Sequence, residues 1–362
     1  MCYTLLFFTL LLLVSSSFCA KQKCCPDREC YELGDPWQTL LRLVPEPRCI
    51  EDPARYLFTN SSNAVYPSVF TTGNISKITD FLDVTKPTLI VIPTWLSSED
   101  SSAIRNVTTV YVSRVNANGI FVDYGKVAMN LNYPQVVSDI RVVARHVIKM
   151  VQTIIKAGVS PSKIHLVGFN VGAHLAAYVA KAIPGIGRLT GLDPARFLFT
   201  DQNCEVRLCK GDAQFTETIH TNGNPVWGFG TSIEDGDVDL WVNGGWDQPN
   251  CGVVVNPLAI LQIGRSKISE VVTDLFFCSL RRAVLYYTEA LASSCVFWGV
   301  KPDPLNMLIS RLTLGHATKF IVHPRNCTLQ NCVPVGLDTI HATGRGSFIV
   351  PTNYQQPFCV SQ

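Results

Sequence analysis

Residues 168–172 read Gly-Phe-Asn-Val-Gly and stand between an apolar run and a stretch with helical periodicity. A glycine on each side allows a strand and a helix to pack closely around the central residue, whose side chain then projects from the turn. A serine at that place attacks a carbonyl carbon once a neighbouring base removes its proton. Asn170 tolerates the positive φ of such a turn but has no oxygen that a base can convert to an alkoxide. The motif therefore predicts a nucleophile position without a nucleophile.

Alternating strand-like and helix-like segments would place this turn at the edge of a sheet. Short apolar runs predict strands at residues 88–92, 107–115, 164–169 and 189–192. Apolar residues spaced by three and four predict helices at 134–157 and 171–183, the first of which begins with Pro134. Because strands and helices alternate, we expect an α/β fold with a central, mainly parallel sheet flanked by helices.

Several ordered motifs resemble the pancreatic-type lipase family, which includes vertebrate pancreatic lipases, insect phospholipases A1 and the yolk proteins of higher flies. These motifs occupy residues 30–32, 55–59, 164–195, 212–213, 219–221, 242–245, 248–251 and 278–283. The resemblance covers nearly the whole chain after residue 20. It implies a disulfide-rich α/β-hydrolase fold in a single domain over residues 21–362, without the C-terminal β-sandwich domain of the pancreatic enzymes.

The resemblance also places the family's catalytic triad on this chain. The nucleophile falls on Asn170, the acid on Asp193 and the base on Leu280, so only the acid is retained. The strand end that reads His-Gly-aromatic in the family is Pro93-Thr94-Trp95 here, and the oxyanion region falls on Trp95 and Val171. Losing the serine or histidine of a triad costs about 10⁶ in turnover. The resemblance therefore implies a pseudoenzyme of a carboxylic ester hydrolase family. The alternative is a weakly active triacylglycerol lipase or phospholipase A1.

A disulfide-bounded lid covers the site in the family, and the comparable segment here runs from Cys204 to Cys209. If these cysteines pair, the loop is too short to cover a deep cleft. The family's calcium loop would involve Glu205, Arg207 and Asp212, but an expected carboxylate falls on Cys209, so we expect no metal and no cofactor. Aromatic side chains in later loops either line a groove for a lipid chain or pack the loops. These are Trp227, Phe229, Trp241 and Trp246.

The N-terminal region predicts export. Residues 5–14 form an apolar run followed by three serines, which is typical of a signal peptide over residues 1–20 with cleavage between 17 and 20, although no basic residue precedes the run. A membrane anchor is the alternative, but the run is much shorter than the roughly 20 residues that span a bilayer. Removal of Cys2 and Cys19 leaves twelve of the 14 cysteines, which predicts six disulfides. Zinc is the competing interpretation, but no cysteine pair with ligand spacing precedes a histidine pair.

Charge and sequons complete the prediction. The net charge is +2, from 30 basic and 28 acidic residues, and no block of like charge favours a nucleic-acid partner. Four Asn-X-Ser/Thr triplets predict glycosylation at Asn60, Asn74, Asn106 and Asn326. We expect a secreted, extracellular protein that keeps the lipase shape without catalysis. It would bind a lipid or another hydrophobic ligand, or serve as a storage or scaffold protein; a protein ligand or decoy is a third possibility, and no protein partner is indicated.

Overall fold

The computed structural model describes residues 3–4, 17–18, 21–61, 67–98, 101–251 and 265–361. Most of the predicted signal peptide, residues 1–20, lies outside these ranges. The described residues include two N-terminal pairs of short strands. These are β1 (Tyr3–Thr4) with β2 (Ser17–Phe18), and β3 (Gln22–Cys24) with β4 (Cys30–Glu32).

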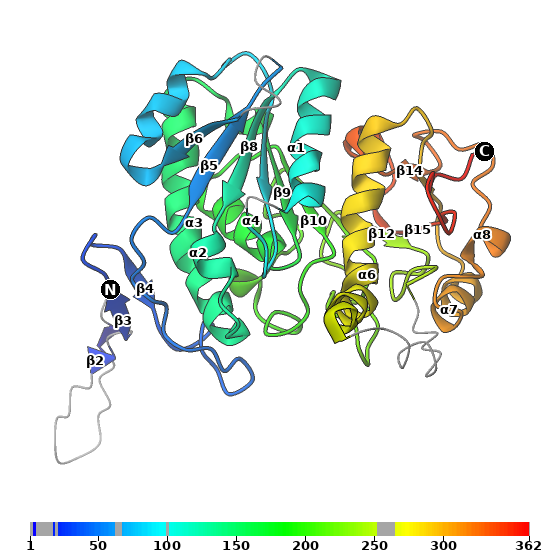
Figure 1. Ribbon diagram of the computed structural model, residues 1–362, viewed down its shortest axis with the longest axis horizontal. Coiled ribbons are helices and arrows are strands. Elements are labelled where there is room, and N and C mark those ends of the chain that lie inside the picture. The colour runs from blue at the N-terminus through cyan, green and yellow to red at the C-terminus, as the bar shows by residue number, and fades with distance from the viewer. Residues whose placement is uncertain are drawn as a thin grey trace.

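A nine-stranded sheet forms the centre of the protein (Figure 1). In spatial order its strands are β15 (Gly346–Val350), β12 (Val238–Val242), β11 (Phe215–His220), β10 (Arg188–Leu192), β9 (Ile164–Phe169), β7 (Thr88–Ile92), β8 (Asn118–Asp123), β5 (Arg55–Thr59) and β6 (Ser68–Thr71). Neighbouring strands are parallel except at β5, which is antiparallel to both β8 and β6. The expected α/β-hydrolase architecture is confirmed.

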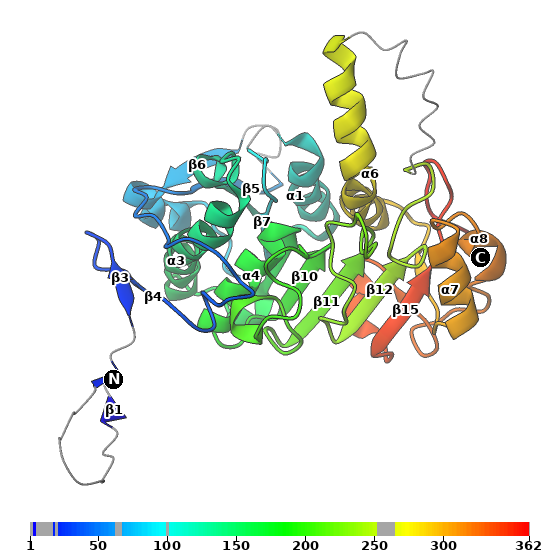
Figure 2. The same cartoon turned by 90° about the horizontal axis from the view of Figure 1, so that it is seen from below.

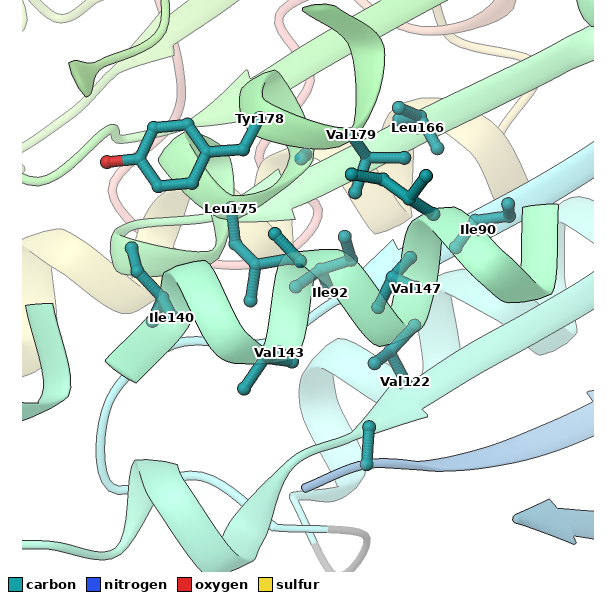
Figure 3. Packing of buried hydrophobic residues seen from close by; sticks show 14 of the residues in the cluster. Ile90, Ile92, Val122, Ile140, Val143, Val147, Leu166, Leu175, Tyr178 and Val179 are labelled. Atoms are coloured by element: carbon teal, nitrogen blue, oxygen red, sulfur yellow. The ribbon is translucent and has the colours of Figure 1, made fainter. Parts of the chain in front are cut away.

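Helices cover both faces of this sheet, as Figures 1 and 2 show. One layer contains α3 (Tyr133–Lys156) and α4 (Val171–Ala182), and the other contains α1 (Ser102–Val115) and α6 (Arg265–Ala292). Successive residues of β7 face opposite layers, because strand side chains alternate. Ile90 and Ile92 pack with α3 and α4, whereas Leu89 and Val91 pack with α1 and α6. Figure 3 shows the first layer, where Val143, Val147, Leu175 and Val179 gather around the sheet residues Ile90, Ile92 and Leu166.

Most predicted elements coincide with observed ones. Strands β7 and β9 have the predicted bounds, and the two predicted helices are α3 and α4 with ends shifted by one residue. The prediction of a strand at 107–115 is wrong, because this segment belongs to helix α1. Its β-branched residues favour a strand locally. Its buried residues Ile104, Val107, Thr108 and Tyr111 are nevertheless spaced by three and four, and this face packs against α6.

Six disulfides are present, which is the number predicted from the cysteine count. They join Cys24 to Cys30, Cys25 to Cys49, Cys204 to Cys209, Cys251 to Cys278, Cys295 to Cys359 and Cys327 to Cys332. The shorter elements are α2 (Gly125–Ala128), α7 (Pro304–Leu312), α8 (Thr318–Ile321), β13 (Trp298–Gly299) and β14 (Val333–Pro334). Within the described ranges, no helix combines the length and apolar character needed to cross a bilayer.

Candidate functional site

A sharp turn joins β9 to α4 and presents Asn170 at the carboxyl edge of the sheet. Asn170 has φ 52° and ψ −109°, a conformation that few residues other than glycine adopt. The flanking glycines permit the close packing around it. A Cβ on Gly168 would lie 2.3 Å from the carbonyl oxygen of Gly172, and one on Gly172 would lie 2.2 Å from that of Pro93. The geometry of the turn is therefore kept although its central residue carries a carboxamide.

The side chain of Asn170 is buried and engaged at both ends. Thr94 Oγ1 donates a hydrogen bond to Asn170 Oδ1 at 3.1 Å, and Asn170 Nδ2 donates to the carbonyl oxygen of Asp193 at 3.1 Å. The carboxamide thus links the segment after β7 to the segment after β10. A carboxamide bonded in this way provides neither a nucleophile nor a general base.

Asp193 follows β10 and is completely buried. Its Oδ1 accepts hydrogen bonds from the backbone amides of Thr221 and Asn222, both at 2.8 Å, so the carboxylate anchors the turn that follows β11. Its Oδ2 has no hydrogen-bond partner among the described residues. Burial raises the pKa of Asp193 to about 6, against the lowering effect of the two amides. Gly230 packs directly on this group, since a Cβ there would lie 2.5 Å from each carboxylate oxygen.

Leu280 lies on α6 and is buried beside Asn170, where both residues line the same cavity. The preceding residue, Ser279, accepts a hydrogen bond from the backbone amide of Gln248 at 3.0 Å. None of the chain's seven histidines is among the described residues that line the cavity. His220 instead bonds to Asp239 at 2.9 Å; although burial opposes protonation, this carboxylate raises the pKa of His220. Among the described residues, no imidazole therefore lines the cavity that Asn170 borders.

The cavity has a volume of about 690 Å³ and an aromatic and aliphatic wall. The aromatic part of its lining consists of Trp95, Tyr133, Phe169, Phe197, Phe229 and Phe277. Ile104 of α1 and Val284 of α6 contribute aliphatic surface from the layer opposite α3 and α4. Arg281 is the one charged residue in the described part of the lining. The contributions of α1 come from residues 102–104, before the segment 107–115 that was expected to be a strand, and the sequence analysis did not find them.

The two positions of the expected oxyanion region lie close to this cavity. Trp95 lines it, and its indole Nε1 donates a hydrogen bond to the carbonyl oxygen of Asn130 at 2.7 Å. Val171 is buried as the first residue of α4. Thr94 also lines the cavity and directs its hydroxyl toward Asn170. The expected oxyanion region is therefore bordered by a side chain that glycine would not supply.

The four aromatic residues expected in a groove lie in different surroundings. Phe229 lines the cavity and stacks on Phe277, with 5.1 Å between the ring centroids. Trp227 Nε1 donates a hydrogen bond to Asp247 at 3.0 Å. Trp241 is buried and stacks on His220 at 3.9 Å, and Trp246 contacts the guanidinium of Arg311. Of the four, Phe229 alone is among the described residues that line the cavity, and the tryptophans pack loops and strands.

The segment from Cys204 to Cys209 is a short loop closed by its own disulfide. The ionic groups near it are paired with one another. Arg207 forms an ion pair with Asp235, and Asp212 binds Lys181 at 2.5 Å. Glu205 borders a separate cavity of about 320 Å³. In the ranges that the structure describes, no three His, Cys, Asp or Glu side chains form a group that could hold a metal ion.

Comparisons with known proteins identify the family of the chain. The family model described as Lipase matches residues 24–314. Pancreatic lipase-related protein 3 of Homo sapiens is 30% identical over 287 residues, which cover 76% of this chain and 60% of that protein. Phospholipase A1 of Vespula squamosa is 28% identical over 76% of this chain and 84% of its own length. Inactive pancreatic lipase-related protein 1 of Homo sapiens is 29% identical over 79% and 62%, respectively.

The matched region spans less than two thirds of both human relatives. Solved structures that resemble the chain include an alpha/beta hydrolase enzyme from a Medee basin deep-sea metagenome library. It shows 16% identity and a TM-score of 0.26, over 43% of this chain and 60% of that one.

Proposed function

Because the chain belongs to the lipase family, we propose that it is a secreted, non-catalytic member that binds a single-chain lipid in the cavity beside Asn170. Asn170 and Leu280 occupy the nucleophile and base positions, and the carboxamide of Asn170 is held by Thr94 and by the backbone of Asp193. One of the similar human proteins is itself named inactive. These features support the loss of ester hydrolysis.

The observation that carries the binding proposal is the cavity itself. Leu280 does not fill the site, since a space of about 690 Å³ remains beside it, within the range of about 300–1,000 Å³ that ligand sites occupy. Its wall is aromatic and aliphatic, which suits a hydrocarbon chain. Burying about ten methylenes at about 0.8 kcal/mol each, less the cost of ordering the chain, predicts micromolar affinity.

The proposal includes the processing of the chain. Residues 21–362 would form one exported domain after removal of residues 1–20, glycosylated at Asn60, Asn74, Asn106 and Asn326. The six disulfides support an oxidising compartment. Asn106 and Asn326 are exposed, as attachment of a glycan requires, and the last strand of the sheet, β15, integrates the C-terminal region into the same fold.

Titration of the purified, disulfide-bonded protein with a fluorescent fatty acid tests the proposal, together with mass spectrometry of lipids extracted from native protein. Ala103 is exposed and lines the cavity, so Ala103→Trp should obstruct it and weaken binding by about tenfold or more. Ala292 is also an exposed alanine near a helix end, but it does not line the cavity, so Ala292→Trp is the matched control. Absence of saturable binding and of extracted lipid would leave the storage or scaffold function.

A further inference from the structure

The loop between β4 and β5 contains a tight turn with two leucines at its tip. Thr39 and Arg42 exchange both backbone hydrogen bonds, at 3.1 and 3.2 Å, so that Leu40 and Leu41 form the two-residue tip. Their exposed fractions are 92% and 85%, and that of Leu43 is 72%. Turns in general favour glycine, proline, asparagine, aspartate and serine. Adjacent leucines at such a tip place apolar surface in water where polar residues would serve the turn better.

A buried arginine fixes this turn to the body of the protein. Arg42 is almost inaccessible, its Nε donates a hydrogen bond to the carbonyl oxygen of Leu198 at 2.9 Å, and its Nη1 donates to that of Trp37. Its guanidinium also lies 5.6 Å from the centroid of the Phe199 ring. The base of the turn is therefore held by a long-range contact, and the exposure of its tip is a fixed feature of the fold.

The same contact joins the turn to the rim of the lipid cavity. Leu198 follows Phe197, which lines the cavity and is partly exposed. The hydroxyl of Tyr133 donates a hydrogen bond to the carbonyl oxygen of Phe197 at 3.0 Å. Leu131, two residues before Tyr133, is exposed. The turn is therefore bonded, through Arg42, to the residue that follows Phe197 of the cavity lining. Figure 1 shows the loop between β4 and β5 reaching the lower side of the view.

Charge indicates what kind of surface the turn fits. Residues 36–45 include one charged side chain, Arg42, and that one is buried. A tip without exposed charge gains nothing from an anionic membrane but gains from burial in any apolar layer. We infer that the Leu40–Leu41 turn inserts into an uncharged or zwitterionic lipid surface and so sets the mouth of the cavity on it. This inference rests on the proposed function, since the cavity would take its ligand from that surface.

Flotation of the full secreted protein with phosphatidylcholine vesicles tests the inference. Leu40→Ser with Leu41→Ser should reduce partitioning by about tenfold or more. Leu305 and Leu312 are similarly exposed, at 62% and 68%, but lie on α7, on the opposite side of the molecule from the loop between β4 and β5 (Figure 1). Leu305→Ser with Leu312→Ser is therefore the matched control and should leave partitioning unchanged. Added salt or phosphatidylserine should change little, because the tip carries no exposed charge.

Equal partitioning of the turn variant and the wild-type protein would overturn the inference. A dimer that the turn variant dissociates, with no vesicle binding by the wild type, would overturn it in favour of a second copy as the partner. Titration with a dissolved fluorescent fatty acid separates the inference from the proposed function, because the turn variant should bind it as the wild type does. If the protein binds vesicles but no fatty acid, lipid binding in the cavity is refuted and insertion of the turn is supported. If it binds fatty acid but no vesicles, only the insertion of the turn is refuted.

Discussion

Thr94 donates a hydrogen bond to Asn170 across 3.1 Å, which joins two residues that stand where the sequence resemblance predicts a glycine and a serine. Glycine at position 94 would offer no hydroxyl to residue 170. The threonine hydroxyl and the carboxamide oxygen are hydrogen-bond partners in a buried site, where an unpaired polar group costs about 1–3 kcal/mol. The two residues are thus physically coupled, and Asn170 is built into the fold.

This coupling predicts a non-additive double-mutant cycle. Thr94→Val removes the hydroxyl with little change in shape, and Asn170→Gly removes the side chain without opposing the positive φ. Each change should lower the free energy of unfolding by about 1 kcal/mol or more, and the double variant should lose about 0.5–1 kcal/mol less than the sum. Urea unfolding of the disulfide-bonded protein measures all four species. Strictly additive losses would mean that the hydrogen bond contributes nothing.

Asp193 should make stability depend on pH. Its pKa is raised to about 6 in the folded protein, so between about pH 4 and pH 6 the folded state binds more protons than the unfolded state. The free energy of unfolding therefore falls as pH rises through this window. Above it, the full cost of ionising the buried carboxyl is present. Asp193→Asn removes the ionisation, so its stability relative to the wild type should improve by about 2–3 kcal/mol between pH 4 and pH 7.5. Paired urea titrations at the two pH values measure this difference, and an unchanged difference would contradict the raised pKa.

The disulfides should differ in their contribution to stability. Cys295–Cys359 joins residues 64 positions apart, whereas Cys327–Cys332 joins residues only 5 apart. Because the loop-closure entropy grows with loop length, paired serine substitutions should cost about 4 kcal/mol for the first bridge and about 2 kcal/mol for the second. Thermal unfolding followed by circular dichroism measures the order. A larger loss from the short loop would show that chain entropy is not the main contribution.

Elements with a clear apolar pattern could be predicted from the sequence, whereas an element whose local propensity opposes its packing could not. Strands β7 and β9 are buried on both faces and read as continuous apolar runs, so their bounds were found. Helix α1 was missed because Val107, Thr108, Thr109, Val110 and Val112 favour a strand locally, while tertiary packing against α6 decides the outcome. Local propensity does not report such a partner.

The candidate site could likewise be predicted in part. The turn at Asn170 and the strand end before Asp193 have sequence signatures, and the structure places Asn170 and Leu280 in the lining of one cavity. The wall of the cavity could not be predicted, since Trp241 and Phe229 look equally suited to a groove until their neighbours are known. Trp241 stacks on His220, whereas Phe229 stacks on Phe277 in the wall of the cavity. The exposed tip at Leu40 was also hidden, because exposure depends on the fold around Arg42.

Catalytic activity should be absent from the wild-type protein, but Asp193 should allow part of it to be restored. The wild-type protein should hydrolyse no triglyceride, phospholipid or nitrophenyl ester above a heat-inactivated control. Asn170→Ser alone should not change this, because a serine hydroxyl without a base is a poor nucleophile at neutral pH. Asn170→Ser with Leu280→His should give measurable nitrophenyl esterase activity, since Asp193 Oδ2, which has no hydrogen-bond partner among the described residues, can accept the imidazole N–H. The gain over Asn170→Ser should be about 10²-fold or more.

Two further variants make the result decisive. Pro93→His with Thr94→Gly should raise the activity of that double variant, because the threonine hydroxyl borders the oxyanion region beside Trp95. Asp193→Ala in the same background should abolish the gain, since the imidazole would lose the group that orients it. Wild-type hydrolysis that a serine-directed phosphonate blocks would place the nucleophile elsewhere in the chain. Wild-type hydrolysis that resists the phosphonate and survives Asp193→Ala would require a mechanism without the triad, and either outcome would refute the non-catalytic proposal.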